Sequence, residues 1–528
     1  MTPPDRAARD RWLTGGLFAL AAVVLLVNLG HYGLWDPDEG RHSEIARELF
    51  DATTWRGKLL PQHNFQPYHD KPILYYWLAA LALGVAGVNE LGARLVSALT
   101  ALGTLAVVFV WCRAVWDRRT ARLAVAVLLT SAGFLAIGRY GSLDMLLTCW
   151  LTLGVAAAER WTAAPERRSL LYVAAVAAGL GMLTKGMIAP LFVGAIPLVF
   201  ALLTRRPIPR SPLAYAGPLL AFVAVAAPWY ATAQVLDPDY LREFFLVHHL
   251  ARFSEDTTTF HAGPWWYYGP GVLLVLFPWS LVLPATLLVV ATRGNEAARF
   301  CLVWAAGIVG FFSLSHGKLV TYVLPAVPPL AAVTAYTLRR HLEHASVRRL
   351  VAGGIGVLVA AVAIAPAIAL RIGHHKPHVV IAQIAPALFT LPFLALALLL
   401  LWRLSGLRAA VLGVAAGMVV CSFVFYAAVA PRVSRVVGEK ELATIIQAAP
   451  PAPIVSYEVT AASMLFYLAR PVIRANRPNQ LRRQLAQHPF LWIVTSPRHV
   501  AEIQAITTVY PWETRGHHIL YATAPRSP

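Results

Sequence analysis

Apolar runs long enough to cross a bilayer as helices recur through the first 430 residues of the chain. The first run occupies residues 13–34, and about 20 consecutive apolar residues suffice to span the hydrocarbon core. No small-residue cleavage site follows this run, so we expect a retained first helix and not a signal peptide. With 58% hydrophobic and only 13% charged residues, the chain is too apolar for a soluble globule. The sequence therefore predicts an all-α polytopic membrane protein.

Arginine clusters between the apolar runs predict how the chain crosses the membrane. Basic residues concentrate on the cytoplasmic side, which is where we expect two clusters: Arg6, Arg9 and Arg11, then Arg113, Arg118, Arg119 and Arg122. An even number of crossings must separate them, so one of the two runs 73–88 and 92–112 does not span. The run 73–88 is the shorter and is rich in tyrosine and tryptophan, which favours an interfacial or re-entrant segment.

From that point a basic cluster follows every second apolar run, and the parity predicts about thirteen transmembrane helices. After the first, the expected spans are 92–112, 122–138, 143–159, 169–184, 187–203, 213–233, 270–291, 297–314, 319–338, 350–370, 381–402 and 409–430. The inside clusters hold 21 of the 45 basic residues. Topology thus explains much of the net charge of +19, and a nucleic-acid partner is not needed. All four cysteines lie in apolar runs, without disulfide or metal-site spacing.

The composition changes after residue 430. Segments 452–458, 471–474 and 490–496 have the pattern of short strands, and 463–469, 479–487 and 497–506 that of helices between them. We therefore predict a transmembrane domain over residues 1–430 and a small α/β domain over 431–528. Parity places this second domain outside the cytoplasm, on the same side as two long loops, 35–72 and 234–269.

Ionisable side chains gather on this external side. They are Asp36, Asp38, Glu39, Arg41 and Glu44 after the first helix, Asp70 and Lys71 before the segment 73–88, and Asp144, Lys185 and Lys318 at the ends of spans, with Tyr322 nearby. Ionisable groups at membrane depth are costly and usually mark a functional path. Carboxylates combined with cations suit a site that handles a phosphate, because the cations stabilise the phosphate while a carboxylate orients or deprotonates an acceptor.

Each of these residues also has a purely structural interpretation. The segment 36–48 fits an amphipathic interfacial helix, Asp70 and Lys71 an exposed ion pair, and Lys185 and Lys318 lysines that extend to the membrane surface. His261 fits an ordinary loop histidine beside an aromatic belt, and the histidines of 374–378 an adventitious metal site. The occurrence of all these groups on one face favours a functional site.

Six motifs in order resemble one known family. They are LWDPDEGRHSEIARELF (34–50), YHDKPILYYWL (68–78), GSLDMLLTCW (141–150), LTKG (183–186), REFFLVHHLARF followed by FHAGPWWYY (242–268), and SHGKLVTYVLPAVPPLA (315–331). Together they resemble the aminoarabinose (lipid A) transferase branch of the GT-C glycosyltransferases, which are related to protein O-mannosyltransferases. The resemblance covers roughly residues 10–340. It implies a GT-C fold with thirteen transmembrane helices and an external C-terminal α/β domain.

The resemblance also implies roles for individual residues. Asp38 and Asp144 match the family's key carboxylates, Arg41, Lys71, Lys318 and Tyr322 would face a substrate phosphate, and Asp70 with His261 matches positions associated with a divalent metal, most often zinc. Two positions depart from the family pattern: His42 stands where tyrosine is usual, and Asp70 replaces a glutamate.

The implied reaction is the inverting transfer of 4-amino-4-deoxy-L-arabinose or a similar sugar from a polyprenyl phosphate to lipid A or another envelope acceptor. It would take place at the external face of the bacterial inner membrane. No Gly-rich phosphate loop or nucleotide-sugar site is expected. Two alternatives stay open: a protein or cell-wall glycan glycosyltransferase of the same fold, and a lipid or solute transporter. The transporter is less favoured because the charges gather at one face and not at the midplane of the bilayer.

Overall fold

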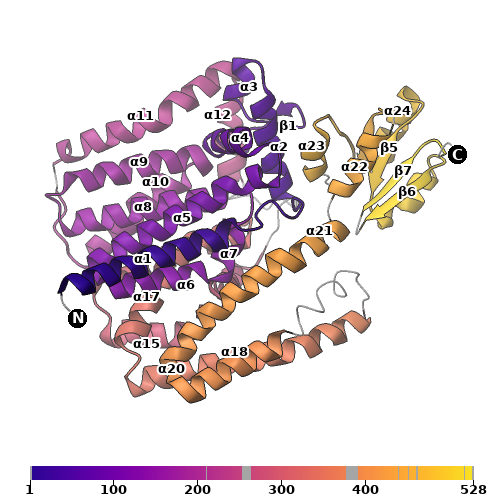
Figure 1. Ribbon diagram of the computed structural model, residues 1–528. Helices are drawn as coiled ribbons and strands as arrows, with labels where there is room; N and C mark the ends of the chain where they lie inside the picture. Colours follow the sequence, from indigo (N-terminus) through magenta and orange to yellow (C-terminus); the bar gives the residue numbers. More distant parts are fainter. Residues whose placement is uncertain are drawn as a thin grey trace.

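The computed structural model describes residues 3–209, 211–251, 263–375, 390–437, 439–449, 451–459, 462–515 and 518–525. A bundle of long helices makes up most of the molecule, and a small sheet with its own helices lies at one end of the bundle (Figure 1). The helix α2 (Asp38–Asp51) lies at that same end and packs against α23 (Ala462–Leu468) of the C-terminal region. The loop after the first helix is therefore located between the bundle and the sheet.

The bundle contains fourteen described helices between residues 3 and 424. They are α1 (Pro3–Leu26), α5 (Glu90–Val115), α6 (Arg118–Leu129), α7 (Ala132–Gly138), α8 (Leu143–Ala163), α9 (Arg168–Lys185), α10 (Ile188–Leu203), α11 (Leu213–Leu236), α14 (Tyr268–Leu276), α15 (Leu283–Arg293), α16 (Glu296–Leu314), α17 (Val327–Arg340), α18 (Ala345–His375) and α20 (Leu391–Val424). Short turns of 3-10 or π helix join some of them: η2 (Trp265–Tyr267), η3 (Trp279–Val282), η4 (Val320–Ala326) and η5 (Phe425–Val429).

Within the described ranges, six helices are long and apolar enough to cross a membrane, or up to eight if each bent pair counts as one span. This confirms a polytopic membrane protein, and the count of thirteen stays a prediction. The segment 73–88 forms the short helix α4 (Leu74–Ala86), whose 13 residues would reach only about 20 Å. It packs against α2 and α5, with Tyr75 and Tyr76 fully buried.

Several expected spans were wrong in their shape. The first helix ends at Leu26 and not at residue 34, because carbonyl groups of the next residues turn toward Arg94 of α5. The expected span 122–138 is bent by 70° between α6 and α7, and 270–291 by 108° near Pro278. Proline cannot continue the hydrogen-bond ladder of a helix, so a break there has a direct physical cause.

The spans expected at 381–402 and 409–430 meet within α20. The described part begins at Leu391 and is interrupted at Gly406, whose φ of 84° lies in the left-handed region. Glycine takes this conformation without a steric penalty because it has no Cβ. The break thus separates the two apolar stretches at the position where the sequence places Arg403 and Arg408.

The two long loops that were predicted to be external carry short elements. After α2 follow α3 (Trp55–Leu59) and the small hairpin of β1 (Gln62–His63) and β2 (Gln66–Pro67). After α11 follow α12 (Tyr240–Arg242) and η1 (Glu243–Ala251). Ten of the 14 residues of α2 are buried, so this helix is an internal element and not an exposed interfacial one.

The C-terminal region has a five-stranded sheet in the order β4-β3-β5-β7-β6. Its strands are β3 (Ile454–Tyr457), β4 (Ile473–Ala475), β5 (Trp492–Thr495), β6 (Tyr510–Arg515) and β7 (His518–Ala522), and its helices α21 (Ala430–Val437), α22 (Lys440–Ala448), α23, α24 (Pro478–Gln487), η6 (Pro497–His499) and α25 (Val500–Gln504). The strand β3 pairs in parallel with β4 and β5, whereas β7 pairs antiparallel with β5 and β6. The three expected strands and three expected helices are confirmed, and α22 and the final antiparallel pair were missed.

Candidate active site

A buried ion pair fixes the start of α2. The side chain of Glu39 is fully buried and makes two short contacts to Arg94 of α5, at 2.7 and 2.8 Å. It also accepts the backbone N–H groups of Trp35 and Gly141, both at 2.8 Å. The guanidinium of Arg94 in turn donates to the carbonyls of Leu29, Tyr32 and Gly33. Because each partner has its hydrogen-bonding groups satisfied, the pair joins the loop, α5 and the start of α8.

The neighbouring Asp38 has the opposite orientation. Its side chain is 41% exposed, that of Arg41 is 30% exposed, and an oxygen of Asp38 lies 3.4 Å from a nitrogen of Arg41. At this distance the two groups attract each other but leave oxygens and N–H groups free for a substrate. The first turn of α2 therefore uses one carboxylate, Glu39, as an anchor and presents the other, Asp38, to solvent.

Asp70 and Lys71 lie beside this turn. The amine of Lys71 is 2.9 Å from a carboxylate oxygen of Asp70, and the other oxygen accepts the hydroxyl of Tyr68 at 3.2 Å. The charges of Tyr68, Asp38 and Asp70 raise the pKa of Arg41, although burial opposes its charged form. The two loop segments thus form one electrostatic group.

Asp144 and Lys185 form an ion pair between the start of α8 and the end of α9. The amine of Lys185 also lies 4.6 Å from the ring centre of Tyr322, and the carboxylate of Asp38 acts on it electrostatically. Lys185 is therefore part of the cluster and not simply a lysine that extends to the membrane surface. The motif LTKG gave only an ambiguous signal for this residue.

The structure thus brings together three carboxylates and three cations from four segments. The carboxylates are Asp38, Asp70 and Asp144, and the cations are Arg41, Lys71 and Lys185. We refer to these six residues as the polar cluster. Since the charges balance, an added phosphate would make the cluster net negative unless a carboxylate gives up a cation or binds a proton. The cluster can therefore bind a phosphate by exchanging partners at Arg41, Lys71 or Lys185.

His42 lies behind the polar cluster and stays neutral. Burial first, and then the charges of Arg41 and Lys71, lower the pKa of His42 well below its usual range. Its Nδ1 atom is 3.1 Å from the hydroxyl of Tyr76. The residue that departs from the family pattern thus keeps a polar contact inside the protein and adds no charge.

Lys318 is not one of the cations that could exchange a carboxylate for a phosphate. Its side chain is 3% exposed, and its amine donates to the carbonyls of Phe312, Ser313 and Ser315 at 2.7–3.3 Å. A lysine amine has three N–H donors, so these carbonyls at the end of α16 occupy all of them. The geometry makes Lys318 a cap of that helix, whereas the predicted neighbour Tyr322 faces Lys185.

The expected metal ligands do not form a site in the part of the chain that the structure describes. No three His, Cys, Asp or Glu side chains come together there as a metal site requires, and the carboxylate of Asp70 is engaged by Lys71 and Tyr68. His261 lies outside the described residues. The predicted metal ligands, Asp70 with His261, therefore stay a prediction, and we assign no step of the reaction to a metal.

Two further contacts around the site were not anticipated from the sequence. His69 lies between Asp237 and Glu243 and joins the loop after the first helix to the loop after α11. Although burial opposes it, hydrogen bonds to Glu243 and Asp237 raise the pKa of His69. His69 and Glu243 each belong to one of the six motifs, but nothing in the spacing of these motifs indicates that the two side chains are in contact.

The second contact is a carboxyl pair, the partly buried Asp36 and the buried Glu439. Asp36 accepts the N–H and hydroxyl of Ser463 at 2.8 and 2.9 Å, and Glu439 accepts the N–H of Met464 at 3.0 Å. Burial first, and then the charge of Asp36, raise the pKa of Glu439, and burial raises that of Asp36. This pair attaches the C-terminal region two residues before Asp38.

Comparisons with known proteins show what the chain is similar to. The family described as dolichyl-phosphate-mannose-protein mannosyltransferase matches residues 70–230. An undecaprenyl phosphate-alpha-4-amino-4-deoxy-L-arabinose arabinosyl transferase of Pseudomonas fluorescens is 33% identical over 67% of this chain and 62% of its own length. One from Pseudomonas savastanoi is 35% identical over 64% of each chain. The chain thus covers less than two thirds of these curated relatives.

Among solved structures, ArnT from Cupriavidus metallidurans bound to undecaprenyl phosphate has a TM-score of 0.79 and is 22% identical, over 97% of this chain and 98% of its own. Its apo form gives a TM-score of 0.78. These values confirm the expected fold class, a GT-C bundle with a small C-terminal α/β region. The chain is therefore a multi-pass membrane protein with the fold of ArnT and a relative of the aminoarabinose transferases.

Proposed function

We propose that the protein is an integral membrane glycosyltransferase that moves 4-amino-4-deoxy-L-arabinose or a similar sugar from a polyprenyl phosphate to lipid A or another envelope acceptor. The observation that carries this proposal is the polar cluster, in which three carboxylates face three cations at one end of the helix bundle. Arginine and lysine are the side chains that bind phosphate, arginine by a planar fork and lysine as a point charge. A lipid-linked phosphate would reach such a cluster from the membrane.

The relatives support the choice of substrates. The curated ones are named for undecaprenyl phosphate and aminoarabinose, and the structure with the same fold is described as bound to undecaprenyl phosphate. The arginine clusters support an external location for the polar cluster, because they recur at the other end of the bundle and basic loops stay in the cytoplasm. We place the active site and the C-terminal domain at the periplasmic face of the bacterial inner membrane.

The residues of the polar cluster have different roles in the proposed reaction. Arg41 and Lys71 would hold the donor phosphate and stabilise the charge that grows as its oxygen leaves the sugar. In a single displacement the acceptor oxygen forms a bond to the anomeric carbon on the face opposite the departing phosphate, which keeps the bonding electron pair. The anomeric configuration is then inverted. A covalent sugar adduct on Asp38 or Asp144 would contradict this step.

The two key carboxylates are not equivalent. Asp144 is neutralised by Lys185, whereas Asp38 is 41% exposed and only loosely paired. An anionic lipid A phosphate needs no base, and Asp38 then orients the acceptor and stabilises positive charge on the sugar ring. A hydroxyl acceptor would need a proton acceptor, and the more accessible Asp38 is the better placed.

Mass spectrometry of envelope glycoconjugates tests the proposal. A deletion strain would be complemented with the wild type, with Asp38→Asn, and with Asp51→Asn as a matched control. Asp51 is also an acidic residue of α2, but its side chain is 51% exposed at the far end of the helix, where it pairs with Arg47. Lipid A and other glycoconjugate fractions from each strain would be compared for the mass of an added sugar.

We expect the wild type and Asp51→Asn to restore a sugar mass in one fraction, which identifies the acceptor. Asp38→Asn should reduce that product by roughly 100-fold or more, by analogy with the loss of one electrostatic group in other active sites. Equal restoration by Asp38→Asn would remove Asp38 from the reaction. If no glycoconjugate changes in the deletion strain, the transferase proposal is wrong and a transporter is favoured.

A further inference from the structure

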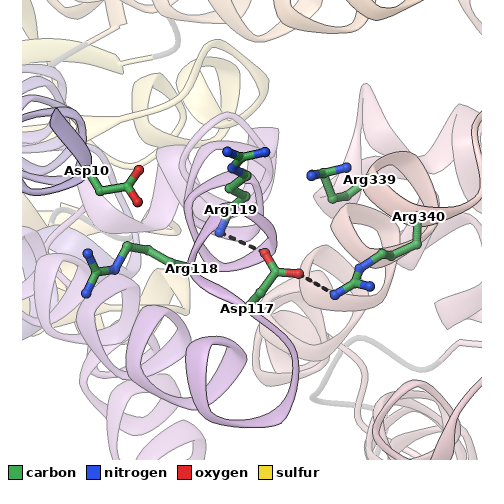
Figure 2. A pocket seen from close by; sticks show the side chains of 6 residues that line it. All are labelled: Asp10, Asp117, Arg118, Arg119, Arg339 and Arg340. Carbon is green, nitrogen blue, oxygen red and sulfur yellow. Dashed lines mark hydrogen bonds and ion pairs between the residues drawn. The ribbon is translucent and has the colours of Figure 1, made fainter. Parts of the chain in front are cut away.

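A second charged site lies at the opposite end of the bundle. The start of α1, the turn between α5 and α6 and the end of α17 enclose a pocket of about 370 Å³, lined by Asp10, Asp117, Arg118, Arg119, Arg339 and Arg340 (Figure 2). The helix α5 runs from the C-terminal region, where Glu90 pairs with Lys440, to this pocket. Its 26 residues span about 39 Å, so the pocket is remote from the polar cluster.

The acidic residues of the pocket are already neutralised. Asp10 pairs with Arg122 at 2.9 Å, and Asp117 pairs with Arg340 at 2.6 Å. Within the described ranges, no carboxylate pairs with Arg118, Arg119 or Arg339. Figure 2 shows these three guanidinium groups together with the dashed contacts of Asp117, which run to the backbone N–H of Arg119 and to the guanidinium of Arg340. The pocket therefore holds three guanidinium groups outside its two ion pairs, and Asp10, which pairs with Arg122, acts on Arg118 and Arg119 only by longer-range attraction.

The framework of the pocket is held in place without any ligand. Asp117 accepts the backbone N–H groups of Arg119 and Thr120 at 2.9 and 2.8 Å and so caps α6. The ring of Trp116 stacks on Tyr336 of α17, with 5.0 Å between ring centres. The turn and α17 are thus linked twice, by this stack and by the Asp117–Arg340 pair. Like charges held together in this way repel each other, and a bound anion relieves the repulsion.

Membrane topology alone accounts for basic residues at helix ends. It does not require that they surround a hollow, or that the nearby carboxylates are paired with other arginines. Arg299, Arg348 and Arg349 show the simpler arrangement, since they are exposed and line no such pocket. The pocket arginines therefore do more than set orientation.

We propose that this pocket binds the phosphate group of an anionic membrane phospholipid. The site lies at the end of α17, which belongs to a candidate span, and at the start of α6, which forms a bent candidate span together with α7. Lipid headgroups are found at such helix ends, and the arginine clusters assign this end to the cytoplasm. Guanidinium groups bind phosphate oxygens through paired N–H donors. Basic pockets between transmembrane helices on the cytoplasmic side are typical sites for anionic headgroups.

Binding of phosphatidylglycerol to the purified full-length protein tests this proposal. The variant Arg118→Gln/Arg119→Gln/Arg339→Gln removes the unpaired charges, and Arg299→Gln/Arg348→Gln/Arg349→Gln removes the same charge outside the pocket. Native mass spectrometry would measure lipid affinity, and thermal unfolding would be recorded with phosphatidylglycerol, with phosphatidylcholine and with inorganic phosphate. None of the six arginines belongs to the polar cluster.

We expect the pocket variant to bind phosphatidylglycerol at least about tenfold more weakly, since each arginine near an anionic lipid contributes about 1 kcal/mol. Added phosphatidylglycerol should raise the melting temperature of the wild type and of the control, and not that of the pocket variant. Equal weakening in both variants would show general surface charge and overturn the proposal. It would also fail if phosphatidylcholine binds as well, or if inorganic phosphate alone stabilises the wild type.

Discussion

Replacing Glu39 by glutamine tests whether a buried ion pair positions the external loop. The change keeps the size and shape of the side chain but leaves one oxygen acceptor for four N–H donors, which are two from Arg94 and those of Trp35 and Gly141. Whichever way the amide turns, its NH₂ group faces two of these donors. The variant therefore both loses a charge and creates repulsive contacts inside the protein.

The size of the effect follows from the burial of the pair. Breaking a buried ion pair by removing one partner destabilises by about 3–5 kcal/mol. The lower end of this range of destabilisation applies here, because Arg94 keeps its hydrogen bonds to the carbonyls of Leu29, Tyr32 and Gly33. A loss of about 3 kcal/mol corresponds to a change of roughly 150-fold in the equilibrium for opening the start of α2. Asp38 and Arg41 sit on that turn and would lose their fixed positions.

Hydrogen exchange of residues 35–50 in the detergent-solubilised full-length protein measures this opening. The matched control is Asp51→Asn on the same helix, which breaks an ion pair whose acidic partner is 51% exposed and should change stability by less than about 1 kcal/mol. We expect exchange in Glu39→Gln to accelerate by roughly 100-fold, with exchange of the strands β3 and β5 unchanged. If both variants behave alike, or Glu39→Gln changes exchange by less than about twofold, Glu39 does not anchor the loop.

Two further changes test other contacts. Lys318→Met should lower the melting temperature, because it removes the lysine donor from the carbonyls of Ser313 and Ser315 at the end of α16, and a buried acceptor left without its donor costs about 1–3 kcal/mol. The KM for the lipid-linked donor should stay within about twofold of the wild type, whereas a roughly tenfold rise in KM with no loss of stability would instead support phosphate binding. The raised pKa of Glu439 means that the folded protein holds a proton that the unfolded chain releases above its own pKa of about 4.3. Stability should therefore fall as the pH rises above about 5, and Glu439→Gln should flatten this slope in thermal unfolding. An unchanged slope would show that the pair with Asp36 is not its source.

The sequence alone predicted the class of protein well. Apolar length and arginine placement are local properties, and the bilayer makes both obligatory. The short, non-spanning character of the segment 73–88 could be predicted for the same reason. The strands β3, β4 and β5 carry a compact hydrophobic pattern, whereas β6 begins with Tyr510 and includes Glu513 and Arg515, and no local pattern marks it. Its place in the sheet comes from pairing with β7.

The site was predicted as a set of residues, and the structure decided what each one does. Asp38 and Glu39 are adjacent acidic residues in the first turn of one helix, yet one is exposed and the other fully buried. Lys185 and Lys318 both end apolar runs, yet one pairs with Asp144 and the other caps α16. Nothing local distinguishes the members of either pair.

The physical reason is that burial and pairing depend on residues far away in the chain. Glu39 is an anchor because Arg94, 55 positions later, reaches it across the bundle, and Lys185 is a site residue because α8 and α9 bring Asp144 to it. The order of the motifs, the apolar runs and the basic clusters can be identified from the sequence alone. The partner of each charge is set only by the packing of helices, because a charge inside a protein is stable only beside its counterion.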